Sequence, residues 1–100
     1  MLERIKNRYY YGHESKSFEL PCLDHRKSFY NKATVFEFDD GMKILVSYTT
    51  PVAAIDKKGN FLRLWDGESM TTTRHINSFL RFYGLTGGGV AWWRNQPVCA

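Results

Sequence analysis

Two runs of aromatic and β-branched residues, separated by Asp39-Asp40-Gly41, constrain the fold most strongly. Residues 29–38 and 42–48 carry the side chains that a pleated, half-buried surface favours. Asp-Gly between two such runs is a strong hairpin signal, because a type I′ turn needs positive φ at both central residues. We therefore predict a hairpin with a two-residue loop, in which Val35 lies opposite Val46. One face then carries Ala33, Val35, Ile44, Val46 and Tyr48, and the other carries Phe36, Phe38 and Leu45.

Shorter strands are predicted on either side of this hairpin. Residues 16–20 are a candidate edge strand. We expect Pro51 to break the chain after the hairpin, because proline lacks the amide hydrogen that a sheet ladder needs. Residues 52–56 and 61–65 are then a third and a fourth strand, joined by a turn rich in glycine, asparagine and charged residues.

Residues 71–83 have the periodicity of an amphipathic helix. The apolar stripe, at positions i, i+3, i+4 and i+7, is Ile76, Phe79, Leu80 and Tyr83. The predicted solvated face is Arg74, Asn77, Ser78 and Arg81. We expect Thr71 or Thr72 to cap the first turn and Gly84 to end the helix, with Leu85 making the apolar contact of a glycine C-cap.

The chain after the helix begins with Gly87-Gly88-Gly89, which is typical of a flexible connector. We predict a strand over residues 90–93, in which Trp92 and Trp93 point to opposite faces. One tryptophan then enters the core and the other lies at the surface or at an interface. The expected fold class is α+β, with an antiparallel sheet of four to five strands and one main helix. Residues 1–27 are expected to be an irregular basic and aromatic arm, and residues 28–100 a single domain.

Membrane and secretory signals are not evident in the sequence. It contains no run of 18 or more apolar residues, and no apolar stretch follows the charged N-terminal residues. Two cysteines do not make a disulfide framework. We therefore expect a cytoplasmic protein in which Cys22 and Cys99 are free thiols, with a single bridge between them as the alternative.

The net charge of +4 is unevenly distributed along the chain. Residues 1–32 contain seven Lys or Arg and four Asp or Glu, residues 33–70 contain four and six, and residues 71–100 contain three and none. Basic and aromatic side chains together can hold single-stranded nucleic acid through phosphate attraction and base stacking. Tyr, Trp and Arg are also enriched in the hot spots of protein interfaces. Both kinds of partner remain open at this point, as does a solvated basic face with no partner.

Candidate catalytic and ligand motifs are weak. Cys22 and His25 make one pair where structural zinc normally takes four clear ligands. The triple glycine follows a helix, whereas a P-loop precedes one, and no nucleophile elbow of the G-x-S-x-G kind is present. His75 fits a partly buried structural histidine better than a catalytic one. The threonines around residue 72 could form an anion site with Arg74, but capping is the simpler reading. We expect no enzyme activity, no metal and no cofactor.

A family resemblance rests on two segments and on a weaker match near the end of the chain. The two segments are Ser47-Tyr48-Thr49-Thr50-Pro51-Val52-Ala53 and Thr71-Thr72-Thr73-Arg74-His75-Ile76-Asn77-Ser78-Phe79-Leu80, and the weaker match is Trp92-Trp93 with Pro97-Val98. From about residue 29 to residue 98 the chain resembles a small uncharacterised family found in phages and mobile elements of Gram-positive bacteria. The resemblance implies a small soluble protein made inside the host bacterium and implies no known activity.

The function that we predict from these observations is non-enzymatic binding. A phage or mobile-element accessory protein of this size is expected to inhibit a host defence effector by steric occlusion, in the manner of an anti-CRISPR protein. The alternative is a small basic nucleic-acid-binding accessory or regulatory protein. The expected partner is a host protein or ribonucleoprotein complex, with possible nucleic-acid contact and no membrane, and the oligomeric state is open, a homodimer included. The candidate partner-binding residues are Arg74, Arg81, Trp92, Trp93, Arg94, Tyr9, Tyr10 and Tyr11.

Overall fold

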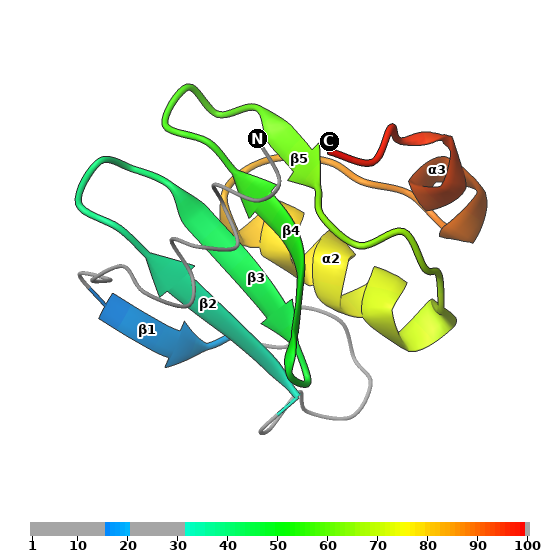
Figure 1. Cartoon of the computed structure of the whole chain (residues 1–100), viewed down its shortest axis with the longest axis horizontal. Coiled ribbons are helices and arrows are strands. Elements are labelled where there is room, and N and C mark those ends of the chain that lie inside the picture. Colours follow the sequence, from blue (N-terminus) through cyan, green and yellow to red (C-terminus); the bar gives the residue numbers. More distant parts are fainter. Residues whose placement is uncertain (1–15, 21–31, 100) are drawn as a thin grey trace.

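A five-stranded antiparallel sheet with one long helix laid across it forms the body of the protein (Figure 1). The computed structural model describes residues 16–20 and 32–99. Each strand pairs with the next one in the chain, so the sheet order is β1-β2-β3-β4-β5. The elements are β1 (Lys16–Glu19), β2 (Ala33–Glu37), β3 (Lys43–Ser47), β4 (Thr50–Ile55), β5 (Phe61–Arg63), α2 (Met70–Phe82) and α3 (Val90–Asn95). The predicted single α+β domain with one main helix is confirmed.

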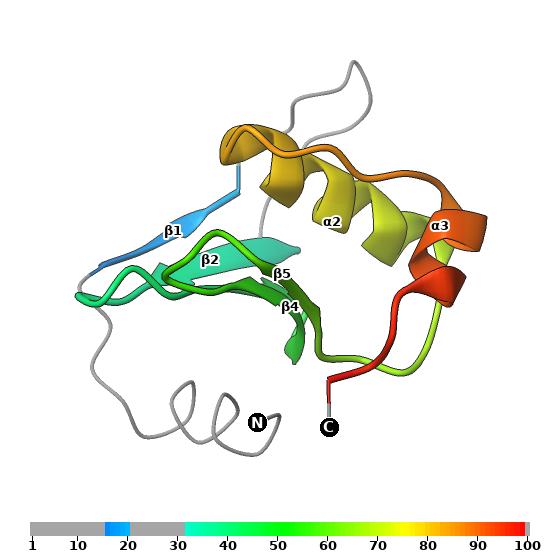
Figure 2. The ribbon, with the colours of Figure 1, turned by 90° about the horizontal axis from the view of Figure 1, so that it is seen from above.

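α2 covers one face of the sheet and closes the larger hydrophobic core (Figure 2). Ile76, Phe79 and Leu80 of this helix are buried, as the apolar stripe predicted. The sheet residues in the same core are Ala33, Val35, Leu45, Val52, Ala53 and Ile55. Full burial of each large side chain stabilises the fold by about 1.5–3 kcal/mol.

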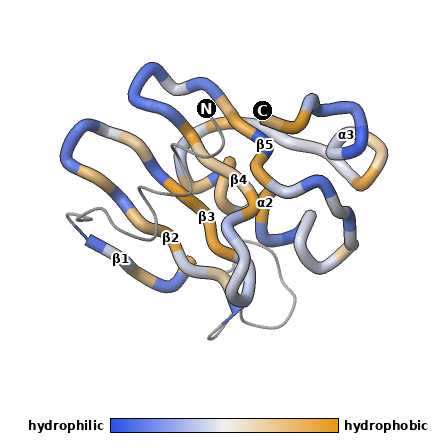
Figure 3. The backbone as a smooth tube through the Cα atoms, viewed as in Figure 1, coloured by the Kyte–Doolittle hydropathy of each residue, from blue (hydrophilic) through white to orange (hydrophobic). Residues whose placement is uncertain are grey.

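The opposite face of the sheet holds a second cluster of buried side chains. Its members are Phe38, Ile44, Val46, Ala54 and Leu64. Hydrophobic residues accordingly concentrate in the central strands, whereas the hairpin tips are hydrophilic (Figure 3). Central strands with two apolar faces were expected, and both of their faces are buried.

The β2–β3 hairpin forms where it was predicted, but its loop has three residues rather than two. The Gly41 amide donates to the Phe38 carbonyl at 3.0 Å, and the Phe38 amide donates to the Met42 carbonyl at 3.0 Å. Gly41 has a φ of +97°, which is the left-handed residue of a type I turn followed by a G1 bulge. The Asp40 carboxylate accepts from the Met42 amide at 3.1 Å and fastens the loop.

This extra loop residue corrects the predicted register. Val35 lies opposite Leu45, and not opposite Val46. Because successive side chains alternate between faces, a shift of one residue exchanges the faces of a whole strand. Leu45 therefore joins Val35 under the helix, whereas Ile44 and Val46 face the second cluster.

Pro51 lies inside β4 and does not break the chain as predicted. It pairs with Val46, where the β3–β4 register is irregular between Leu45 and Val46. A bulge is one of the few places where a sheet tolerates proline. In the turn that precedes it, Tyr48 has a φ of +57°, a left-handed conformation that costs a bulky residue about 1–3 kcal/mol.

The outer strands also differ from expectation in their extent. The predicted edge strand at residues 16–20 is present as β1, so the sheet begins before the expected domain boundary at residue 28. β5 ends at Arg63 rather than at Trp65, and its outer edge is covered by the C-terminal segment. There the Cys99 amide donates to the Arg63 carbonyl at 2.7 Å.

α2 begins and ends one residue earlier than the predicted range 71–83, and Gly84 terminates it as predicted. Ser69, and not Thr71 or Thr72, is the N-cap, and its hydroxyl accepts from the Thr72 amide at 3.0 Å. At the other end Gly84 has a φ of +79° and donates to the Arg81 carbonyl, while the Leu85 amide donates to the Leu80 carbonyl. These two bonds form a Schellman motif, which turns the chain back along the helix.

The segment predicted as a strand with two tryptophans is the helix α3. A run of four apolar residues does not distinguish a short strand from a buried helical turn by periodicity. Trp93 is fully buried and its indole donates to the Gly67 carbonyl at 2.7 Å. Trp92 is half-buried and lies 5.6 Å from the ring of Phe61. One tryptophan is therefore in the core and the other is nearer the surface, as expected, although both lie on a helix rather than on a strand.

Arg63 ties β5 to α3 through its buried guanidinium. It is 7% exposed, and its centre lies 4.5 Å from the ring of Trp93. The guanidinium donates to six carbonyl oxygens, those of Trp65, Asp66, Gly67, Trp93, Arg94 and Gln96. The last three lie at the C-terminal end of α3, where carbonyl oxygens carry partial negative charge and attract a cation.

Candidate functional site

Arg74 and Arg81, two of the predicted site residues, lie in one row along the outward side of α2. Arg74 and Arg81 are seven residues apart, which separates their Cα atoms by about 10 Å along the helix axis. Arg74 is half-buried and Arg81 is exposed. The helical periodicity that buries Ile76, Phe79 and Leu80 turns both guanidinium groups away from the sheet.

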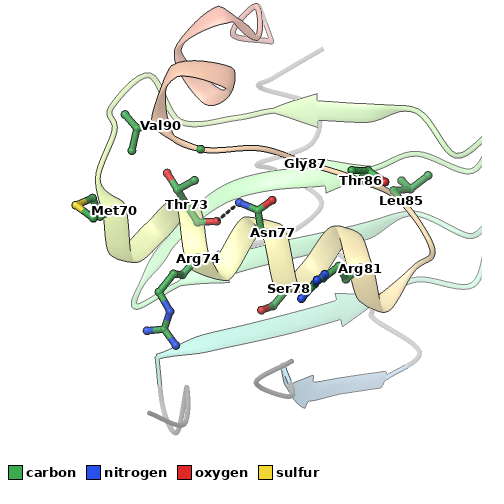
Figure 4. A pocket seen from close by; sticks show the side chains of 11 residues that line it. Met70, Thr73, Arg74, Asn77, Ser78, Arg81, Leu85, Thr86, Gly87 and Val90 are labelled. Carbon is green, nitrogen blue, oxygen red and sulfur yellow. Dashed lines mark hydrogen bonds between the residues drawn. The ribbon is translucent and has the colours of Figure 1, made fainter. Parts of the chain in front are cut away.

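A second wall comes from the chain that follows the helix and runs along the side of α2 that carries Thr73 and Asn77 (Figure 4). The Schellman motif directs residues 85–89 back along α2, where Asn77 holds them. The Asn77 amide nitrogen donates to the Gly88 carbonyl at 2.6 Å and to the Thr73 carbonyl of its own helix at 3.0 Å. A Cβ on Gly87 would lie 2.5 Å from the Asn77 side-chain oxygen, so the close approach requires glycine there. The expected flexible connector is therefore a packed wall.

Between these walls lies a groove of about 640 Å³ (Figure 4). We call it the α2 groove; its lining is Met70, Thr73, Arg74, Asn77, Ser78, Arg81, Leu85, Thr86, Gly87, Gly89 and Val90. Apolar contact surface comes from Met70, which is 76% exposed, and from Leu85 and Val90. The groove thus combines apolar surface with hydroxyl and amide groups.

The α2 groove is positively charged. Two arginines and no acidic residue belong to its lining. The first turn of α2 also lacks an acidic residue. Within the described part of the chain, Arg81 makes no ion pair that would neutralise it. A groove of this composition favours an anionic group over a cation.

The inner side of the same helix holds His75, which is fully buried rather than partly buried as predicted. Its Nδ1 lies 2.9 Å from the Ser47 hydroxyl, which is also 3.4 Å from the Thr72 hydroxyl. Burial, together with the smaller effect of the positive charges of Arg74 and Lys32, lowers the pKa of His75 to about 4. The imidazole is therefore neutral at pH 7 and fastens α2 to the end of β3.

A second buried contact ties the other end of α2 to the sheet. The Tyr83 hydroxyl donates to the Glu37 carboxylate, which also pairs with Lys16 at 3.2 Å. The Tyr83 bond is the largest cause that lowers the pKa of Glu37, and burial is the largest that raises the pKa of Tyr83. With the Ser47–His75 bond, this contact holds α2 at both ends of the groove.

The remaining predicted site residues lie elsewhere. Arg94 is exposed on α3 and pairs with Glu68 at 3.0 Å. Trp92 and Trp93 pack toward the core and do not line the α2 groove. Tyr9, Tyr10 and Tyr11 fall outside the described residues.

Two side chains expected on the solvated face of the helix are instead buried or hydrogen-bonded within the protein. Ser78 is 3% exposed, and Asn77 is bonded to the second wall. The threonines suggested as an anion site serve the fold, because Thr72 and Thr73 are buried and the Thr73 hydroxyl donates to the Ser69 carbonyl at 2.7 Å. The simpler reading, capping by these threonines, is also wrong, because Ser69 is the N-cap and Thr72 supplies only the amide that it accepts from.

The sequence reasoning missed Met70 and the wall residues Leu85, Thr86 and Val90. The signal that could have found them is the glycine C-cap, since a Schellman motif reverses the chain and returns it beside its own helix.

Metal and thiol candidates contribute little to the described structure. Residues 16–20 and 32–99 contain no cluster of three His, Cys, Asp or Glu residues that could hold a metal ion. Cys99 is a free, half-buried thiol, and the other members of the suggested zinc pair, Cys22 and His25, fall outside the described residues. Within those same ranges no helix has the length and apolar character needed to cross a membrane.

Comparison with known proteins identifies a family. No curated protein and no solved structure matches the chain. A family model described as "Family of unknown function (DUF8033)" matches residues 18–95. The match begins within β1, earlier than residue 29, and includes both segments that carried the main resemblance as well as the α2 groove. The chain therefore belongs to the DUF8033 family, whose function is unknown.

Proposed function

We propose that this chain is a non-enzymatic binding protein whose α2 groove receives an acidic segment of a partner protein. The observation that carries the proposal is the pair of arginines, Arg74 and Arg81, on one wall of a groove whose lining contains no acidic residue. Arginine is favoured at interfaces because its planar fork matches a carboxylate and its charge is weakly hydrated.

The rest of the lining supports a protein segment as the ligand. Met70 offers a flexible apolar side chain of the kind that adapts to partner surfaces. A volume of about 640 Å³ accommodates several side chains of a peptide rather than a whole domain. Thr86 and the Gly87 backbone supply polar groups that can fix the orientation of the bound segment.

In its finer form the proposal is that this is a phage or mobile-element accessory protein. It would bind a host defence effector, a protein or a ribonucleoprotein, and inhibit it by occlusion. The small size of the chain, its resemblance to a phage-associated family and the basic groove support this form. Occlusion needs affinity and bulk at one site of the effector and no chemistry of its own.

The test compares two charge-matched double variants. Arg74→Glu/Arg81→Glu reverses the charge of the groove, and Lys57→Glu/Lys58→Glu makes the same change in net charge on the exposed β4–β5 turn. The tagged wild type is expressed in a defence-competent bacterium, and the captured proteins and plasmid interference are measured. We expect the groove variant to lose capture and inhibition by about tenfold or more, whereas the turn variant keeps both. Both variants should unfold within about 0.5 kcal/mol of wild type.

Enrichment of no defence component, together with normal plasmid interference, would contradict the finer form. Equal capture by the two variants would contradict the role of the groove itself.

Nucleic-acid binding is the second candidate, favoured by the absence of acidic residues from 71 to 100. It predicts an affinity that falls steeply with salt, because bound counterions are released from the phosphates. The affinity for nucleic acid is measured between about 50 and 200 mM salt. An affinity that does not change over this range argues against nucleic-acid binding.

A further inference from the structure

The α2 groove has two chemically different ends. Met70, at the first turn of α2, and Val90, at the start of α3, line one end and offer apolar surface (Figure 4). Arg81 and Thr86 line the other end. The wall between them, residues 85–89, therefore runs antiparallel to α2. A ligand that is apolar at one end and anionic at the other matches this arrangement.

Arg81 supplies the positive charge at the basic end. Its side chain is exposed, and within residues 16–20 and 32–99 it takes part in no ion pair. Arg74 has an interaction of its own within the protein, so Arg81 is the arginine at which we expect a ligand anion to bind. A carboxylate fits best, because the planar guanidinium donates two parallel hydrogen bonds to it.

The second wall offers main-chain groups as well as side chains. Residues 85–89 belong to neither a helix nor a strand, and Gly89 is extended, with a φ of −80° and a ψ of −167°. In the described part of the chain, the amides and carbonyls of Thr86 and Gly87 make no hydrogen bond, and both residues line the groove. An extended peptide can bond to such groups with its own main chain, whereas a helix has used its own internally. The wall therefore favours an extended ligand.

The dimensions of the groove also fit an extended segment. Met70 and Arg81 are eleven residues apart on α2, which is about 16 Å along the helix axis. Spread over this length, the volume of about 640 Å³ corresponds to a mean cross-section of about 40 Å². A strand occupies about 5 Å by 10 Å, or about 50 Å². A helix with its side chains occupies about 80–110 Å², which is too wide for the groove.

We propose that the α2 groove binds an extended peptide segment in which an apolar and an acidic residue lie four positions apart. The apolar side chain packs between Met70 and Val90, and the carboxylate binds the Arg81 guanidinium. Residues four apart on a strand share a face and are separated by about 13 Å, and their side chains cover the remaining distance. The main chain between them bonds to Thr86 and Gly87. This assignment rests on the proposed function of the groove and specifies the form of its ligand.

Seven-residue peptides labelled with fluorescein test the segment. Each carries a leucine and a glutamate four positions apart, in one order or the other, with serine and threonine elsewhere. By fluorescence anisotropy we expect one of the two orders to bind with a Kd below about 1 mM. Replacing the glutamate by glutamine should weaken binding about tenfold. Moving it by one position should do the same, because its side chain then points to the other face. Amide hydrogen exchange across residues 85–89 should slow when the peptide is bound.

Three single variants of the protein locate the contacts. Arg81→Gln and Met70→Ser change the two ends of the groove separately, and each should weaken binding by about fivefold or more. Arg81→Gln should also bind the glutamate and glutamine peptides equally. Lys58→Gln removes the same charge from the exposed β4–β5 turn and should bind within about twofold of wild type. All three side chains are exposed, so the variants should fold as the wild type does.

Two outcomes overturn the extended segment. They are no binding of the peptide in either order, and unchanged hydrogen exchange across residues 85–89 in the complex. A peptide of the same charge held in a helix by α-aminoisobutyric acid separates this result from the proposed function. If only the helical peptide binds, and Arg81→Gln weakens it, the groove takes an acidic ligand but not in extended form. If neither form binds, and Arg81→Gln captures partner proteins as the wild type does, the role of the groove is wrong as well.

Discussion

Arginine occupies two contrasting places in this small protein. Arg63 is buried between β5 and α3, with its guanidinium bonded to six carbonyl oxygens and stacked on Trp93. Arg74 and Arg81 lie along the outer side of α2, in a groove that is open to solvent. The residue type and the formal charge are the same in both places. The difference lies in their surroundings: Arg63 is enclosed by acceptors of its own fold, whereas Arg81 is exposed to solvent.

The buried arginine also shows how carbonyl oxygens alone can hold a cation, since none of its hydrogen-bond acceptors in the described part of the chain is a carboxylate. The carbonyls at the end of α3 carry partial negative charge, which attracts a cation. Arg63 satisfies them and closes the loop from Trp65 to Gly67 at the same time. Arg81, in contrast, is exposed at the groove and makes no ion pair within the described part of the chain.

The largest effect that this contrast predicts follows from removing the six hydrogen bonds between the Arg63 guanidinium and its carbonyl acceptors, which we call the Arg63 cage. Arg63→Met removes the donors to six carbonyls and leaves them buried with fewer partners, so we expect a loss of about 3–5 kcal/mol in the free energy of unfolding. A domain of this size has about 5–15 kcal/mol in total. Urea unfolding followed by tryptophan fluorescence measures the change, and Trp93 makes the signal local to the cage.

Arg63→Lys is the control for charge, because lysine keeps the positive charge and lacks the planar fork. It should recover less than half of the lost stability. A stable Arg63→Met protein would show that the cage is not needed, and the contrast between the two sets of arginines would fail.

The order of the five strands and α2 could be predicted from the sequence, because it follows from local patterns, whereas α3 was predicted as a strand. Alternation and β-branched residues located the central hairpin, and the 3.6-residue stripe located α2. The register could not be predicted, since Asp39-Asp40-Gly41 fits both a two-residue and a three-residue loop. The choice between them depends on whether one or two residues take positive φ, and that choice moves Leu45 to the other face.

Only those residues of the candidate site that lie on α2 could be predicted from the sequence. Arg74 and Arg81 were identified together because residues seven apart share one side of a helix. The second wall depends on tertiary packing of Asn77 against Gly88, which no local pattern encodes. Arg63 was missed for the same reason: an alternating strand pattern states which face a residue takes and not what lies against it.

His75 provides a second, intermediate test of how this protein treats buried basic groups. Unlike arginine it can lose its proton, and burial holds its pKa at about 4, below the ordinary 6.5. Between these two pH values the unfolded chain binds a proton that the folded chain does not. The free energy of unfolding therefore falls as the pH is lowered from 6.5 to 4, by about 2–3 kcal/mol. Urea titrations at intervals across this range measure the slope.

His75→Gln removes the titration and should flatten that slope, at some cost in stability at pH 7. His13→Gln/His25→Gln changes the other two histidines, so a slope that persists in this variant is assigned to His75. Glu37 also has a lowered pKa, but its contribution is lost as the pH falls below about 4.5, so it acts at the acid end of the window. An unchanged slope in His75→Gln would assign the pH dependence to other groups.

The smallest predicted loss of stability is that of a substitution at Arg94. The backbone carbonyl of Arg94 belongs to the Arg63 cage, whereas its side chain faces solvent. Its carbonyl accepts from Arg63, while its guanidinium pairs with Glu68 at side-chain exposures of 65% and 41%. An exposed ion pair contributes about 1 kcal/mol or less, and salt screens it. Arg94→Gln keeps the carbonyl, so we expect a loss below about 1 kcal/mol that disappears at high salt. Unfolding in urea at low and high ionic strength measures it. A loss as large as that of Arg63→Met, unaffected by salt, would mean that the side chain and not the backbone of Arg94 supports the cage.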